Sequence, residues 1–158
     1  MAGHAGHAIS RSEYFARPLP TATVQALLDE FGAARTPGQA RELDFTPWAG
    51  AYARVPVGAT AFAHRTARFL LKQTVTVEPD ADRAAGTGWL ERSWALVHPW
   101  GTGGVYPNFP DLRLADGPRA YHGPNLDRLR RVKAAYDSDG FFRFPQGLRH
   151  CGSRGGRS

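Results

Sequence analysis

The residues whose types and spacing could support chemistry gather around Tyr106. Tyr106 and Asn108 stand two positions apart in residues 105–109, which are typical of a short extended segment. Residues i and i+2 of a strand point to one face, so a phenol and a carboxamide at this spacing can offer hydrogen-bond donors and acceptors together to a polar ring edge. The alternative is structural, because a Tyr-x-Asn sequence before a proline-containing turn can also cap a strand.

His64 is the remaining titratable candidate for a catalytic role, and its alternative is a structural histidine that bonds the backbone at a strand end. The pair His4 and His7 has a spacing that could hold a metal ion loosely, but no second pair supports it, so no metal site is expected. The single cysteine, Cys151, has neither a disulfide partner nor a positioned base.

Length and composition indicate one globular domain. The chain has 158 residues, of which 42% are hydrophobic and 11% aromatic. Its net charge of +6 could suggest nucleic-acid binding, yet the arginines are either scattered among carboxylates or placed in the C-terminal tail, so no nucleic-acid partner is expected. The apolar runs are too short to span a bilayer, and no apolar leader begins the sequence, so the expected location is cytoplasmic.

Hydrophobic periodicity predicts two long helices in the first two thirds of the chain. The first lies within residues 14–34, has Thr21 as its expected N-cap, and places on one face Val24, Leu27, Leu28 and Phe31. The second covers residues 80–98, and Gly86 and Gly88 suggest that its regular part starts near Thr87.

Strands and boundaries complete the predicted architecture. Strands are expected over residues 41–48, 51–57 and 68–77, and a last helix is expected to begin near Asn125. Short turns between strands favour an α+β fold, an antiparallel sheet with helices packed on one face. The predicted boundaries are a disordered leader over residues 1–11, one domain over 12–148, and a disordered basic tail over 149–158.

An ordered set of motifs runs from the middle of the chain towards its end. It comprises the F-x-H-R run at residues 62–65, then Tyr106, Asn108, Phe109 and Asp111, then Tyr121, Gly123 and Asn125, and finally Arg128, Leu129, Val132, Lys133, Tyr136, Asp137, Phe142 and Gln146. This order resembles the C-terminal, substrate-binding part of berberine bridge enzyme-like FAD-linked oxidoreductases. The resemblance implies an FAD cofactor, a small-molecule substrate, and Tyr106 and Asn108 placed beneath or beside the flavin ring.

Three side chains are candidates for the substrate wall: Trp48, Gln73 and Phe109. The side to which Gln73 points depends on the strand register, and tryptophan is more often a core residue. Many family members carry a tyrosine as catalytic base at the position of Phe109, and a phenyl ring cannot exchange a proton. A carboxylate that assists this base in several members is also missing, because residues 48–64 contain no Asp or Glu and the expected positions hold Ala53 and Arg54.

The resemblance further implies that most flavin contacts belong to an FAD-binding domain that these residues do not resemble. The first hypothesis is therefore the C-terminal part of an FAD-dependent oxidoreductase, which forms the substrate pocket and one wall of the flavin site and works with a separate FAD-binding domain or chain. The alternative is a non-catalytic fragment or interaction module that retains the fold. Whether the chain alone is an enzyme stays open between these two hypotheses.

Overall fold

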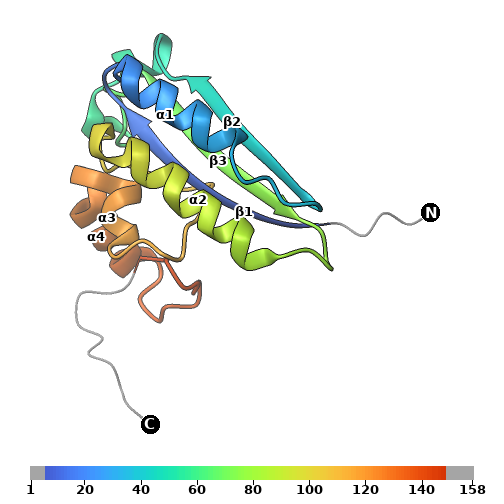
Figure 1. The fold of residues 1–158 in the computed structure, drawn as a ribbon. Helices are drawn as coiled ribbons and strands as arrows, with labels where there is room; N and C mark the ends of the chain where they lie inside the picture. Colours follow the sequence, from blue (N-terminus) through green and yellow to red (C-terminus); the bar gives the residue numbers. More distant parts are fainter. Residues whose placement is uncertain (1–5, 149–158) are drawn as a thin grey trace.

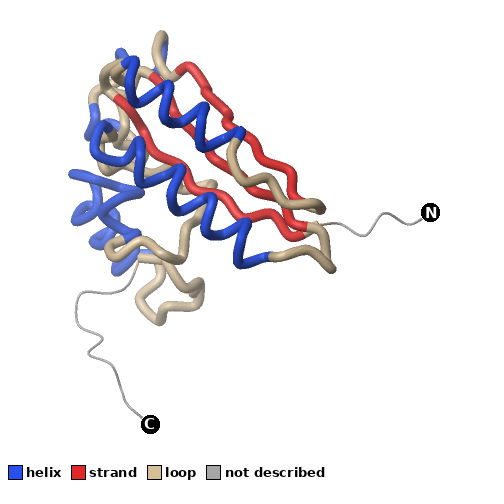
Figure 2. Tube along the Cα trace, in the orientation of Figure 1, coloured by secondary structure: helices blue, strands red, loops and turns tan. Residues whose placement is uncertain are grey.

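A three-stranded antiparallel sheet carries the rest of the molecule (Figure 1). The computed structural model describes residues 6–148. The strands are β1 (His7–Phe15), β2 (Gln39–Pro47) and β3 (Phe69–Val77), in the spatial order β1-β3-β2. Two helices, α1 (Thr21–Gly32) and α2 (Arg83–Val97), cover one face of the sheet, and Figure 2 shows both in front of the strands. The predicted α+β fold with helices on one face is confirmed.

The C-terminal part packs beside β1 rather than on the helix layer (Figure 1). It contains the short helix α3 (Gly117–His122), which was not predicted. It also contains α4 (Leu126–Tyr136), which begins one residue after Asn125, close to the predicted start. Four 3-10 helices connect the larger elements: Ala51–Arg54, Val57–Ala59, His98–Trp100 and Gly123–Asn125. Among residues 6–148, no helix is both long and apolar enough to cross a membrane.

Strand β1 corrects the prediction of a disordered leader over residues 1–11. Residues 7–15 pair with β3 from His7↔Val77 to Phe15↔Phe69, while residues 1–5 and the predicted tail at 149–158 lie outside the described residues. The strand ends at Phe15, and α1 then begins at Thr21, the residue that was expected as the N-cap of the first helix. The run of polar residues from Ser10 to Glu13 hid the strand, because their partners lie far away in the sequence.

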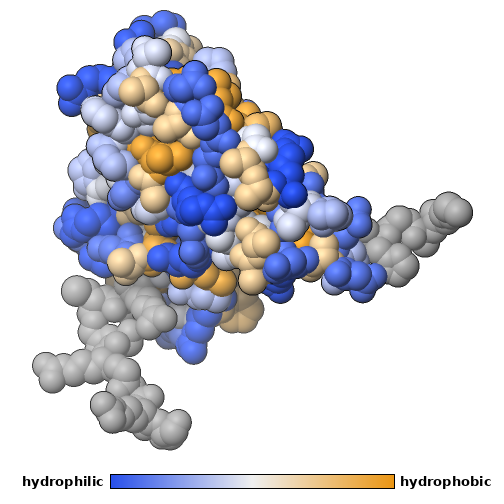
Figure 3. Space-filling model, viewed as in Figure 1, coloured by the Kyte–Doolittle hydropathy of each residue, from blue (hydrophilic) through white to orange (hydrophobic). Residues whose placement is uncertain are grey.

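The helix side of the sheet contains most of the apolar core. One cluster is formed by Phe15, Leu27, Leu71 and Val97, and a second by Val75, Val77, Trp89 and Leu90. Burial of each such side chain contributes about 1.5–3 kcal/mol. Helix α1 contacts this core through Leu27 and Phe31, whereas Val24 and Leu28, which were predicted to share the same buried face, are exposed. In Figure 3, apolar and polar side chains alternate over the outer surface of the helix layer.

Helix α2 begins four residues earlier than the two glycines suggested. Asp82 caps its N-terminus, because the side-chain Oδ1 accepts a hydrogen bond of 3.0 Å from the backbone N–H of Ala85. Gly86 faces β3, and a Cβ atom there would come within 2.8 Å of Val77 Cγ2. The glycine therefore permits close packing of α2 on β3 rather than delaying the helix.

Two predicted extended segments are not strands. Residues 51–57 form 3-10 turns, since Pro47 ends β2 and Gly50 adopts a φ of 88° that turns the chain. Arg65 fixes this loop by donating hydrogen bonds to the carbonyl oxygens of Tyr52 and Phe62. Residues 105–109 form a turn in which the N–H of Phe109 bonds the carbonyl of Tyr106 at 2.9 Å, so the predicted strand geometry around Tyr106 is wrong.

Candidate functional site

The sheet face opposite α1 and α2, here called the rear face, carries a cluster of aromatic side chains. Tyr14 and Leu70 rise from β1 and β3 in the same row of the sheet. With Ala67 they form a buried cluster, against which other side chains pack: Trp48, Phe62, Tyr106 and Phe109. Trp48 and Phe109, which were predicted to line a substrate wall, are thus brought together on one face with Tyr106.

The rings of the rear face form a connected strip. The ring centroids of Trp48 and Tyr106 are 5.3 Å apart, and those of Tyr106 and Phe109 are also 5.3 Å apart. Tyr14 lies beneath this strip, with its centroid 5.2 Å from that of Trp48. Such edge-on contacts hold aromatic rings in fixed orientations, so the strip is a preformed surface on which a flat ligand could lie.

Asn108 lies beside Tyr106, the middle ring of this strip. The Asn108 amide donates a hydrogen bond of 3.0 Å to the Tyr106 hydroxyl, and Asn108 is exposed. The two polar groups are therefore adjacent, as the spacing predicted, although a turn rather than a strand brings them together. Together they present a carboxamide and a phenol to whatever covers the rear face.

Tyr14 was missed by the sequence analysis, yet it is the most deeply buried phenol of the cluster. Its side chain is fully buried, and its hydroxyl has no hydrogen-bond partner among the described residues. Burial, followed by the neighbouring phenols Tyr106 and Tyr52, raises the pKa of Tyr14. Tyr14 therefore stays neutral and acts as an apolar platform rather than as a base. The indole N–H of Trp48 is likewise buried without a partner.

His64 fits the structural alternative better than a catalytic role. Its Nε2 donates a hydrogen bond of 2.9 Å to the carbonyl oxygen of Tyr121, and its ring stacks on Tyr14 at 4.5 Å. Burial lowers the pKa of His64, so the imidazole is neutral, with the proton on Nε2 fixed by the carbonyl. The side chain thereby connects the loop before β3 to the end of α3.

Gln73 does not lie on the rear face. The register of β3 alternates, and Gln73 points with Leu71 and Val75 towards the helices. It is 1% exposed, and its Oε1 has no partner among the described residues. The prediction that Gln73 belongs with Trp48 and Phe109 in one substrate wall is therefore not supported by the geometry.

A charged cluster on the rear face was also missed. Lys72 of β3 places its Nζ 3.2 Å from Glu42 Oε1 and 3.7 Å from Asp44 Oδ2, both on β2. The same Nζ lies 5.2 Å from the ring centroid of Phe109. The resemblance placed the expected carboxylate within residues 48–64, whereas the alternation of β2 before Pro47 places acidic side chains on this face.

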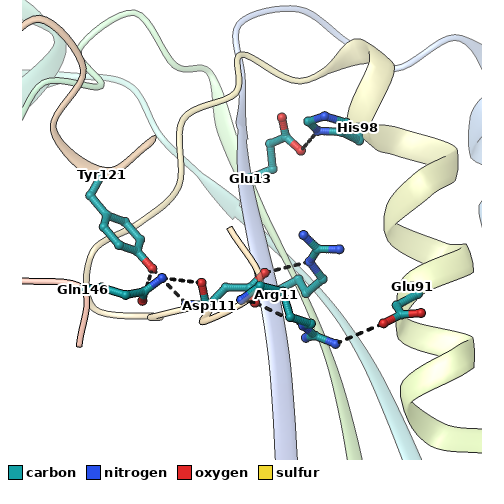
Figure 4. Close-up of polar contacts among 8 residues, drawn as sticks. Arg11, Glu13, Glu91, His98, Asp111, Tyr121 and Gln146 are labelled. Atoms are coloured by element: carbon teal, nitrogen blue, oxygen red, sulfur yellow. Dashed lines mark hydrogen bonds and ion pairs between the residues drawn. The ribbon is translucent and has the colours of Figure 1, made fainter. Parts of the chain in front are cut away.

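A buried hydrogen-bonded ring positions the segment that carries the site (Figure 4). The Tyr121 hydroxyl donates to Gln146 Oε1 at 2.7 Å and accepts from the backbone N–H of Asp111 at 2.9 Å, while Gln146 Nε2 donates to the Asp111 carbonyl at 2.6 Å. The Asp111 carboxylate pairs with Arg11 of β1 at 2.8 Å. Asp111, Tyr121 and Gln146, all members of the motif set, are thus structural residues that hold residues 105–113 beside β1.

Comparisons with known proteins agree with this geometry. Residues 105–149 match the family described as "Berberine and berberine like". An uncharacterized FAD-linked oxidoreductase of Bacillus subtilis (strain 168), YvdP, is 36% identical over 104 residues, which are 66% of this chain and 23% of that protein. Berberine bridge enzyme-like 21 of Arabidopsis thaliana is 30% identical over an alignment of 158 residues, covering 87% of this chain and 28% of that protein.

Solved structures show the same fold. Wild-type BBE-like 1 of Physcomitrella patens superimposes with a TM-score of 0.78 at 25% identity, covering 91% of this chain and 30% of that one. Aclacinomycin oxidoreductase gives a TM-score of 0.82 at 23% identity, covering 95% of this chain and 34% of that one. The chain spans less than a quarter of the length of its bacterial relative YvdP. It belongs to the berberine bridge enzyme-like FAD-linked oxidoreductases and represents one part of them.

Proposed function

We propose that the chain forms the substrate-facing wall of an FAD-dependent oxidoreductase and contributes one side of the flavin site. The observation that carries this proposal is the aromatic strip of Trp48, Tyr106 and Phe109 on the rear face, with Asn108 exposed beside it. Substrate and cofactor sites are typically apolar surfaces with a few fixed polar groups, and this strip has that composition.

The residues present fit one wall of a flavin site. The exposed Asn108 amide and the Tyr106 hydroxyl are the groups that would hold the polar edge of the flavin, since they offer donor and acceptor atoms side by side. When bound, FAD supplies the acceptor for a hydride taken from the substrate. The buried phenol and indole of Tyr14 and Trp48 keep the ring surface dry and fixed, so this chain would orient the substrate and exclude water.

Glycines 101, 103 and 104 do not provide a phosphate site. The N–H of Gly103 donates to Glu13 Oε1 at 3.1 Å, and the carbonyl of Gly104 accepts from the N–H of Tyr14 at 2.9 Å. This loop is therefore bound to β1 rather than open to an anion. A complete flavin site requires an FAD-binding domain outside these 158 residues.

We further propose that this domain docks on the surface around α4. Three large apolar side chains that follow α4 are exposed: Phe141 by 83%, Phe142 by 72% and Phe144 by 68%. Tyr136 of α4 is exposed by 88%. Apolar groups gathered in this way mark contact surfaces, and the relatives are about four times longer than the aligned part.

The test is a titration of the purified chain with FAD, followed by visible absorbance and flavin fluorescence, first alone and then with the FAD-binding domain of a complete relative. We expect binding that requires both parts and an interaction that the triple change Phe141→Ser, Phe142→Ser, Phe144→Ser weakens. Leu28→Ser, which alters an exposed apolar residue on α1, is the matched control. A folded chain that binds neither the domain nor FAD would overturn the proposal and leave the interaction module.

A further inference from the structure

The polar end of the rear face follows directly from the strand register. Ser12 of β1, Lys72 of β3 and Asp44 of β2 stand opposite one another in a single row across the sheet. The next row contains Ser10, Thr74 and Glu42, and in it the Ser10 and Thr74 hydroxyls are 3.0 Å apart. Side chains in the same row point to the same face, so these two rows adjoin the row of Tyr14 and Leu70.

The charged groups and the aromatic strip form one continuous surface. Lys72 links them, because its Nζ lies over the Phe109 ring and contacts both carboxylates. A flat ligand on the strip of Trp48, Tyr106 and Phe109 would therefore extend directly towards Glu42 and Asp44.

Exposure decides which of these groups can meet a ligand. The Lys72 side chain is 21% exposed, whereas those of Asp44 and Glu42 are 41% and 57% exposed. The ammonium is already occupied by two carboxylates and a ring, so the accessible atoms are carboxylate oxygens. Two carboxylates against one ammonium leave an excess negative charge, and no other charged side chain from β1 or β3 lies on this face in these rows.

A buried hydroxyl in the same row provides independent support for a ligand. Ser12 is 2% exposed, and its Oγ has no partner among the described residues. Its register places it beside Lys72, on the face of the charged cluster. A buried polar group without a partner costs about 1–3 kcal/mol, so this hydroxyl is a polar group that a ligand bound on this face could satisfy.

We propose that Glu42, Asp44 and Lys72 form a charge-selecting subsite, which admits aromatic substrates whose polar end donates hydrogen bonds and rejects those whose polar end is anionic. The carboxylates accept hydrogen bonds from hydroxyl or ammonium groups, and the excess negative charge would repel a carboxylated ligand. Lys72 holds the two carboxylates in position and limits their mutual repulsion. This inference rests on the proposed function, because it specifies the substrate class of the same wall.

The test uses three ligands with one ring and different polar ends: tyrosol, which is neutral, tyramine, which is cationic, and 4-hydroxyphenylacetate, which is anionic. Each is titrated into the full ¹⁵N-labelled chain in the absence of flavin. The NMR chemical shifts of the backbone N–H groups of Trp48 and Phe109, and of the Trp48 indole N–H, then give the dissociation constants. We expect the neutral and cationic ligands to bind about five- to tenfold more tightly than the anionic one.

Variants separate charge selection from ring binding. Glu42→Gln combined with Asp44→Asn is expected to bring the three dissociation constants to within about twofold, and Lys72→Met to widen the difference between cationic and anionic ligands. Asp127→Asn, at an exposed position on α4, controls for total charge. Salt should weaken the ranking, because exposed charges are screened.

The outcomes distinguish the inference from the proposed function. Equal binding of all three ligands at the rear face would overturn the charge-selecting subsite and leave the substrate wall intact. Preference for the anionic ligand would also overturn it. Chemical-shift changes confined to residues on other faces would contradict both the subsite and a preformed substrate wall. Flavin binding in the presence of an added FAD-binding domain would still show the flavin role.

Discussion

Alternate residues of β3 serve two different surfaces. Leu71, Val75 and Val77 point to the helices and fill the main core, whereas Leu70 and Lys72 point to the rear face, where aromatic rings and charges meet. The helix side is closed by α1 and α2, while the rear face keeps accessible carboxylates and a buried hydroxyl without a partner. The helix side therefore contains the main apolar core, and the rear face carries the proposed ligand site.

The strongest test of this division compares one aromatic residue from each face. Trp89 of α2 is fully buried and donates a hydrogen bond of 3.1 Å to the Glu30 carbonyl, so Trp89→Ala should lower the free energy of unfolding by about 3–5 kcal/mol. Phe109→Ala, on the rear face, should cost about 1–2 kcal/mol because that ring is only partly buried. Urea denaturation followed by circular dichroism measures both. Equal losses would show that the rear face is as important to stability as the helix side.

A second test examines how closely the helix layer packs on β3. Gly86→Ala would place a methyl group against Val77 and Val75 and should cost about 1–3 kcal/mol. The matched control is Gly88→Ala, whose Cβ would meet only the flexible end of Arg92 at 3.4 Å, and which should be neutral or stabilise the helix by up to about 1 kcal/mol. In thermal and urea unfolding, the stability should fall for Gly86→Ala and stay unchanged or rise for Gly88→Ala. An unchanged or higher stability of Gly86→Ala would contradict the close approach at Gly86.

A third test concerns a buried carboxylate on the helix side. Glu13 accepts hydrogen bonds from His98 Nδ1 at 2.8 Å and from the N–H of Gly103, yet burial outweighs them and raises its pKa above the ordinary 4.5 (Figure 4). A raised pKa means that the folded state retains a proton which the unfolded state loses. The stability from this group is therefore complete below about pH 4.5 and is lost as pH rises through the folded pKa.

The variant Glu13→Gln should remove that dependence, because an amide can still accept from Gly103 and does not ionise. The difference in unfolding free energy between wild type and variant should fall with rising pH, at no more than about 1.4 kcal/mol per pH unit. Urea unfolding at a series of pH values measures this slope. A difference that rises with pH would mean that the hydrogen bond from His98 outweighs burial and lowers the pKa of Glu13.

Periodicity identified the elements whose burial is regular. β2, β3, α2 and α4 were located because their apolar residues recur at strand or helix spacing. β1 was missed because its centre is polar. Arg11 pairs with Asp111 and Glu13 with His98, and such distant partners are invisible in a local window. Conversely, residues 51–57 alternate without a neighbouring strand to pair with, so their alternation predicted a strand that does not exist.

The sequence predicted most residues of the candidate site but not their arrangement in space. Trp48, Tyr106, Asn108 and Phe109 do gather at one place, but Gln73 points away, since its facing depends on a register that the sequence leaves open. Glu42, Asp44 and Lys72 could have been found by alternation along β2 and β3. Alternation alone does not show which face of the sheet is open, because the packing of α1 and α2 decides it.

The smallest expected effect concerns the hydroxyl of Tyr14, at the centre of the rear face. Removing a buried polar atom that has no partner costs nothing in hydrogen bonds and removes a desolvated group, so Tyr14→Phe should leave stability unchanged or raise it by about 1 kcal/mol. The ring contacts with Trp48 and His64 would be retained. A loss of more than about 1 kcal/mol would instead reveal a bound water or a neighbouring acceptor at this hydroxyl. In that case the rear face would be internally satisfied, and the difference from the helix side would be smaller than the present packing indicates.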